Sequence, residues 1–74
     1  NRDTSWLKDK KLSDELNFSD AVLAYRCVTG ACSGGVEGFL NKHNKKEKYN
    51  ISEIIELTKN EYGNESFAEF FQSS

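Results

Sequence analysis

The sequence lacks long apolar runs, proline and internal repeats. Its longest aliphatic stretch is Ala21–Ala24, far short of the roughly 20 apolar residues that cross a bilayer, so no membrane partner is expected. The first residue is asparagine instead of methionine, which indicates a processed, trimmed or truncated product. Its 74 residues, 36% hydrophobic and 30% charged, suffice for one domain at most, near the lower size limit for a single apolar core.

Histidine and cysteine are also scarce, which argues against catalysis and metal binding. Residues 30–34 read Gly-Ala-Cys-Ser-Gly, the form of a nucleophile elbow, but an elbow follows a strand and the sequence predicts none there. The single histidine, His43, lies roughly 16 Å from Cys32 along the same predicted helix and cannot activate it. Cys27, Cys32 and His43 are three ligands where structural zinc needs four. We expect a protein that is not an enzyme, with no catalytic residue, no metal and no cofactor.

The two cysteines allow two interpretations. In a secreted domain, Cys27 and Cys32 can close a local disulfide that pins the chain reversal between two helices. In a reducing compartment they are small, mostly buried thiols. So short a closed loop removes little entropy from the unfolded chain, and we favour the thiols. The location stays unknown, with the cytoplasm favoured over secretion.

Charge is unevenly distributed along the chain, although the net charge is only −2. Residues 42–48 hold four lysines and one glutamate, a net +3, and residues 49–74 hold five glutamates and one lysine, a net −4. A nucleic-acid-binding domain usually gathers basic residues on one face and is basic overall. The Lys42–Lys48 segment is short and is interpreted as a solvated loop. A nucleic-acid partner is therefore not expected.

Apolar residues at three- and four-residue spacings predict helices over residues 20–28, 31–42 and 51–62, and a short fourth helix from Asn64 to Gln72. Gly30 is expected to end the first helix in a left-handed conformation, because glycine has no Cβ to clash there. No segment alternates apolar and polar residues over a length sufficient to predict a strand. The predicted fold class is all-α: a compact small bundle of three main helices plus a short C-terminal fourth helix.

Asparagine precedes three of the apolar segments, each time in an Asn-x-Ser triplet, at Asn17, Asn50 and Asn64. The triplets fit glycosylation acceptors of a secreted chain, but Asn is also a preferred helix N-cap, and we favour capping. Residues 1–11 are interpreted as a loosely structured lead-in to a single helical domain over residues 12–74. Residues 12–16 are expected to form a turn of helix, and residues 41–50 a polar linker.

Glycine is concentrated at the start of the second predicted helix, where Gly34, Gly35 and Gly38 follow one another closely. Each costs about 1 kcal/mol relative to alanine in a helix, so the pattern indicates a need for bare backbone. We interpret the three glycines as a place where a neighbouring helix crosses at close range. A homodimer seam is the alternative use of the Gly34-x3-Gly38 spacing.

The C-terminal helix combines phenylalanines with acidic residues. We expect its phenylalanines to belong to the core and some of them also to anchor a partner protein, with glutamates at the rim. The function predicted is a small protein–protein interaction module of an accessory, inhibitory or immunity type. The first alternative is a secreted, disulfide-pinned helical protein or effector, and the second is nucleic-acid binding through Lys42–Lys48. The predicted partner-binding residues are Glu65, Phe67, Glu69, Phe70 and Phe71.

Overall fold

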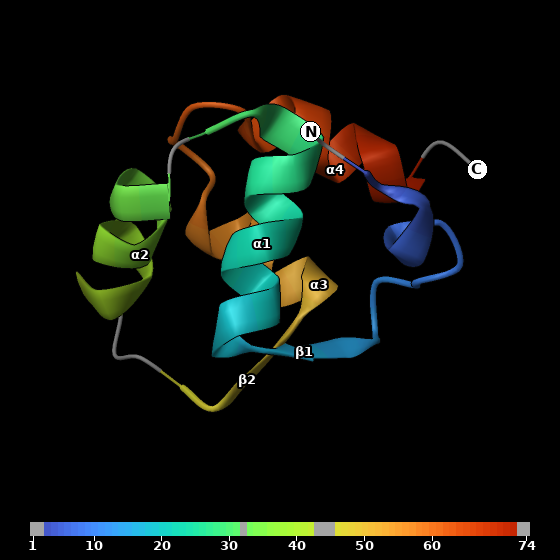
Figure 1. Ribbon diagram of the computed structural model, residues 1–74, viewed down its shortest axis with the longest axis horizontal. Helices are drawn as coiled ribbons and strands as arrows, with labels where there is room; N and C mark the ends of the chain where they lie inside the picture. The colour runs from blue at the N-terminus through green and yellow to red at the C-terminus, as the bar shows by residue number, and fades with distance from the viewer. Residues whose placement is uncertain (1–2, 32, 43–45, 73–74) are drawn as a thin grey trace.

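The structure, a computed structural model, describes residues 3–31, 33–42 and 46–72, without the side chains of Ser33, Phe39 and Asn41. In chain order its elements are η1 (Ser5–Leu7), a turn of 3-10 helix, β1 (Glu15–Asn17), α1 (Phe18–Thr29), α2 (Ser33–Lys42), β2 (Lys48–Asn50), α3 (Ile51–Leu57) and α4 (Asn64–Gln72). α1 is central and packs against α2, α4 and both strands (Figure 1). No helix of these described ranges is long and apolar enough to cross a membrane.

A two-stranded antiparallel sheet closes one end of the molecule, with Leu16 paired to Tyr49. The predicted all-α bundle is therefore wrong, and the fold is mixed α/β. Each strand has only three residues, of which only the middle one is buried, so neither shows an alternating pattern long enough to detect. β1 replaces part of the helical turn expected over residues 12–16, and β2 lies in the expected linker, where Tyr49 is fully buried.

Each strand ends on the asparagine that caps the next helix. The Asn17 side chain accepts a hydrogen bond from the backbone N–H of Asp20, and the Asn50 side chain accepts one from that of Glu53. Capping by these two asparagines is confirmed. At the other end of α1, Gly30 adopts φ 80° and its N–H donates to the Arg26 carbonyl, which confirms the left-handed C-cap.

α3 ends at Leu57, earlier than the expected limit of Tyr62. Asn64 explains the difference, because its side-chain amide donates to the Ile55 carbonyl at 2.9 Å and to the Thr58 hydroxyl at 3.0 Å. In a continuing helix the Ile55 carbonyl would accept from the backbone N–H of Lys59, which instead donates to Glu56. Asn64 is thus the first residue of α4, and its side chain joins the end of α3 to the start of α4.

The core lies between all four helices and the sheet, and it includes a residue from the expected lead-in. Leu7 of η1 is fully buried, and Trp6 packs against the core beside it. Within the same core, the rings of Tyr25 and Phe67 lie 5.0 Å apart between centroids. The segment before residue 12 therefore contributes to the same core as the helices.

Candidate partner-binding site

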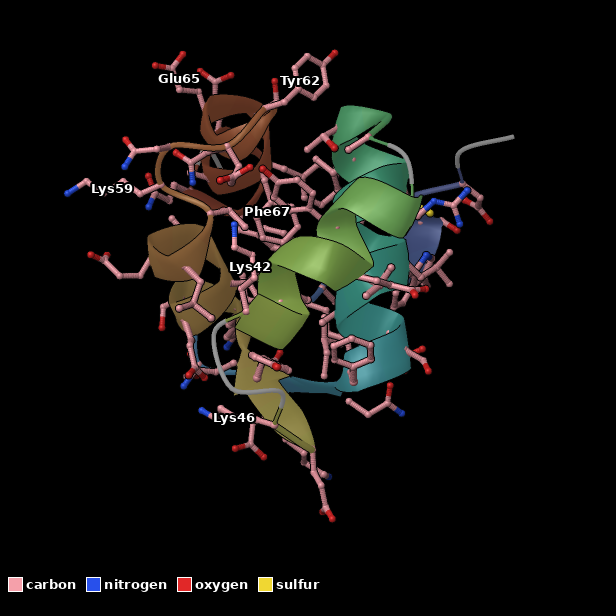
Figure 2. The ribbon with its side chains drawn as sticks, turned by 90° about the vertical axis from the view of Figure 1, so that its left-hand side faces the viewer. Lys42, Lys46, Lys59, Tyr62, Glu65 and Phe67 are labelled. Carbon is pink, nitrogen blue, oxygen red and sulfur yellow. The ribbon has the colours of Figure 1, made fainter. Side chains whose placement is uncertain are left out.

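The turn between α3 and α4 carries a solvent-exposed aromatic side chain. Tyr62 is 76% exposed, the most exposed large hydrophobic residue that the structure describes. Figure 2 shows its ring pointing away from the body of the protein, while Phe67 lies inside. The helix predicted over residues 51–62 included Tyr62, but α3 ends at Leu57 and Tyr62 lies in the turn that follows. The polar residues Lys59, Asn60 and Glu61 before it are the local signal for a turn.

The backbone of this turn is fixed although the Tyr62 ring is exposed. The Tyr25 hydroxyl donates a hydrogen bond of 2.7 Å to the Tyr62 carbonyl. Within the turn, the Glu61 N–H donates to the Thr58 carbonyl at 2.8 Å, and the Asn64 N–H donates to the Glu61 carbonyl at 3.2 Å. The Tyr62 ring is therefore displayed from a backbone whose conformation is already set, which lowers the entropy lost when a partner binds.

Gly63 lets the turn approach the end of α1. Its φ of 85° is in the left-handed region, and a Cβ built there would lie 2.5 Å from the Cβ of Thr29. The Thr29 side chain is held in place, because its hydroxyl donates to the Tyr25 carbonyl at 2.7 Å and accepts from the Ala31 N–H at 3.1 Å. Glycine is thus required at position 63 by both backbone conformation and space.

A pocket of about 400 Å³ opens beside Tyr62, between the end of α1, the start of α2 and the α3–α4 turn. Its walls are mainly apolar, with the Tyr25 ring and Val36 among them. Glu61 stands at its edge and is exposed, as is Glu65, which lies four residues later in the first turn of α4. The pocket is lined by Tyr25, Gly30, Ala31, Gly35, Val36, Thr58, Glu61 and Tyr62.

The electrostatic environment of Tyr25 reflects this position at the base of the pocket. Burial raises the pKa of the Tyr25 hydroxyl above its ordinary value of 10.0, because ionisation would place a charge in a poorly solvated site. The neighbouring Thr58 hydroxyl lowers the pKa in part, and the negative charge of Glu61 adds to the rise. Tyr25 is consequently a neutral hydrogen-bond donor at physiological pH and serves to hold the Tyr62 carbonyl.

The predicted partner-binding residues of α4 do not form one surface. Phe67 is fully buried between Tyr25 and Phe71, so its ring is not accessible to a partner in this conformation. Glu65 and Glu69 are exposed and lie four residues apart, hence on the same side of α4. Glu65 also lines a polar hollow together with Tyr62. The exposed aromatic residue nearest to the acidic residues is therefore Tyr62.

Phe70 and Phe71 are half-buried, and their ring centroids lie 4.9 Å apart. They line a separate groove together with the N-terminal segment, which contributes lysines instead of acidic residues. We call this the Lys–Phe groove; it is lined by Lys8, Lys10, Lys11, Leu12, Ser13, Phe70 and Phe71.

The close helix crossing expected at the glycines of α2 is not found at Gly34 or Gly38. Both are exposed, and a Cβ built at either would meet nothing within 4 Å in the described part of the chain. Gly35 is also exposed, and it lines the pocket beside Tyr62. At Gly34 and Gly38, low helix propensity is therefore not a sign of close packing, because glycine also occurs on exposed helix faces.

The remaining sequence predictions lie partly outside the described residues. Cys27 is half-buried and forms no disulfide with another described residue. Cys32 lies outside the described residues, so both the favoured free thiols and the alternative disulfide stay predictions. In the Lys42–Lys48 segment, residues 43–45 are also outside the description. Lys46 forms an ion pair with Glu53, and its backbone N–H donates to the Tyr49 hydroxyl at 2.8 Å. This lysine therefore has a structural role.

Within residues 3–31, 33–42 and 46–72, no group of three or more His, Cys, Asp or Glu side chains is placed to hold a metal ion. No protein-family model matches the sequence, and comparisons with curated proteins and with solved structures find no significant match.

Proposed function

We propose that the protein is a small protein–protein interaction module that binds its partner through the Tyr62 surface, defined as Glu61, Tyr62 and Glu65 with the adjoining pocket. The observation that carries the proposal is the 76% exposure of Tyr62 on a backbone fixed by Tyr25. Tyrosine is enriched among the residues that dominate binding energy at protein interfaces, because it buries a large area at low entropic cost. The module binds and does not catalyse.

The chemistry of the Tyr62 surface specifies the partner. The ring of Tyr62 and the apolar wall of the pocket require an apolar side chain opposite them. Glu61 and Glu65 are exposed and require lysine or arginine around that side chain. The expected partner is therefore a protein segment in which an apolar residue is bordered by basic residues. Of the residues predicted from the sequence, this surface keeps Glu65. It adds Glu61 and Tyr62, and it leaves out Glu69 and the phenylalanines of α4.

A random-peptide display selection tests the proposal without assuming a partner. The protein is immobilised, bound peptides are eluted, and peptides that also bind the Tyr62→Ala variant are removed. We expect Tyr62-dependent peptides that share an apolar residue next to lysine or arginine. The Tyr62 side chain makes no hydrogen bond to the described part of the fold. The hydrogen bond from the Tyr25 hydroxyl is to the backbone carbonyl of residue 62, which alanine retains, so the variant is expected to keep the native structure.

Leu23→Ala is the matched control, because Leu23 is 42% exposed on α1 and does not line the pocket. Selected peptides should bind this control as they bind the wild type. A selection that yields no Tyr62-dependent peptide, or yields acidic sequences, would contradict the proposal.

A further inference from the structure

The Lys–Phe groove lies at the end of α4 opposite the Tyr62 surface. Figure 1 shows the turn that precedes α4 at one end of this helix and the N-terminal segment beside its other end. The groove has a volume of about 430 Å³, within the range of pockets that accept a bulky side chain. Its floor is apolar, formed by Phe70, Phe71 and Leu12, of which Leu12 is 37% exposed.

The rim of the groove is positively charged. Lys8 and Lys11 are exposed and Lys10 is half-buried, and none of the three forms an ion pair with a carboxylate in the part of the chain that the structure describes. An apolar floor surrounded by free ammonium groups fits an aromatic residue bordered by carboxylates. Aromatic rings also attract lysine ammonium groups placed over their faces.

The same chain carries that complementary group. The Tyr62 surface presents one exposed aromatic ring between two exposed glutamates, Glu61 and Glu65. We propose that the partner of the Tyr62 surface is a second copy of this chain, whose Lys–Phe groove receives the Tyr62 ring while its lysines face Glu61 and Glu65. This inference rests on the proposed function, because it names the partner of the surface assigned there.

Charge favours a second copy over an anionic membrane as the occupant of the groove. The chain has a net charge of −2, so it is repelled as a whole by an anionic lipid surface. The groove is also concave, which suits one inserted side chain better than a flat bilayer. Two copies of equal net charge still attract locally, because the acidic surface of one faces the basic groove of the other.

The two surfaces differ, so the contact is heterologous: each copy uses its Tyr62 surface toward one neighbour and its Lys–Phe groove toward another. Such contacts generate rings or open chains instead of a symmetric dimer. The contact is small and rich in charge, so we expect weak self-association that is reduced when salt screens the ion pairs.

Sedimentation velocity over increasing protein concentration tests the inference. We expect reversible self-association of the wild type in about 50 mM NaCl and a shift toward monomer in about 500 mM NaCl. Tyr62→Ala and the double variant Lys8→Glu/Lys11→Glu should each weaken the association at least about tenfold. The altered side chains are exposed, and circular dichroism verifies that both variants fold.

Mixing the two variants gives the most specific result. Tyr62→Ala keeps an intact groove and Lys8→Glu/Lys11→Glu keeps an intact Tyr62 surface, so an equimolar mixture should form a heterodimer that neither variant forms alone. Both variants are net negative, so non-specific attraction does not explain a complex. Lys42→Glu/Lys48→Glu is the matched control, because it makes the same charge change at two exposed lysines outside the groove and should associate like the wild type.

A wild type that stays monomeric to millimolar concentration overturns the inference, as does self-association that neither variant weakens or a mixture that forms no heterodimer. These outcomes leave the proposed function standing if the display selection still yields Tyr62-dependent basic peptides. Failure of that selection together with variant-sensitive self-association would instead restrict the function of Tyr62 to self-assembly. Binding of the Lys–Phe groove to anionic vesicles without self-association would identify a membrane as the occupant and reject the second copy.

Discussion

Replacement of Gly63 by alanine should destabilise the fold, while the same replacement at Gly38 should stabilise it. At position 63, alanine would adopt a left-handed conformation, at a cost of about 1–2 kcal/mol. Its Cβ would also lie 2.5 Å from the Cβ of Thr29, so Thr29 must move and weaken two hydrogen bonds worth about 1 kcal/mol each. We therefore expect a loss of about 2–4 kcal/mol.

This loss is large relative to the total stability of a chain this short. At roughly 0.05–0.15 kcal/mol per residue, 74 residues give an unfolding free energy of about 4–11 kcal/mol. Gly38 provides the control because it is exposed within α2 and an added Cβ would meet nothing within 4 Å in the described residues. Gly38→Ala should gain about 0.5–1 kcal/mol through better helix propensity.

Urea denaturation followed by the fluorescence of Trp6, the single tryptophan, measures both free energies. A double-mutant cycle with Thr29→Gly isolates the clash, because this change removes the Cβ that the new methyl group at position 63 would meet. Gly63→Ala should then cost at least about 1 kcal/mol less than in the wild-type background. A Gly63→Ala variant as stable as the wild type, or an equal loss with and without the Thr29 side chain, would refute this account of the turn.

Three further changes test other parts of the fold. Leu7→Ala should lower the unfolding free energy by about 2–4 kcal/mol because Leu7 is fully buried, whereas a detached N-terminal segment would leave it unchanged in urea denaturation. Asn17→Ala and Asn50→Ala should each cost about 1 kcal/mol through the loss of a helix cap, and an unchanged thermal melt of the helix signal would oppose this. The raised pKa of Tyr25 means that the unfolded chain ionises more readily above pH 10.0, so stability should fall as pH rises beyond that value. The unfolding free energy of the Tyr25→Phe variant should fall less steeply with rising alkaline pH than that of the wild type, as measured by denaturation at each pH. An equal pH dependence in the two proteins would exclude this contribution of Tyr25.

The parts of the fold that could be predicted from the sequence depend on neighbouring residues. The caps at Asn17 and Asn50 and the left-handed Gly30 are satisfied by backbone groups three or four residues away, so a short window of sequence contains the whole signal. The apolar spacing of α1 and α4 is similarly local.

The parts that could not be predicted depend on distant contacts. Leu16 and Tyr49 pair across more than thirty residues of sequence, and the strands that carry them are too short to show a pattern. The end of α3 depends on the side chain of Asn64, and the exposure of Tyr62 follows from that end. For the candidate site, the sequence analysis named Glu65 but neither Glu61 nor Tyr62, because both lie in a turn whose position could not be predicted.

Photocrosslinking at position 62 tests the central claim most directly. A photoreactive benzoylphenylalanine replaces Tyr62 in one variant and Leu23 in the matched control, and each is irradiated in an extract of the native host. The account predicts a discrete protein adduct from position 62 alone, which a high concentration of salt suppresses, and an adduct of twice the chain mass if the partner is a second copy. No adduct from position 62, or the same adducts from both positions, would contradict the assignment of Tyr62 to a partner-binding surface.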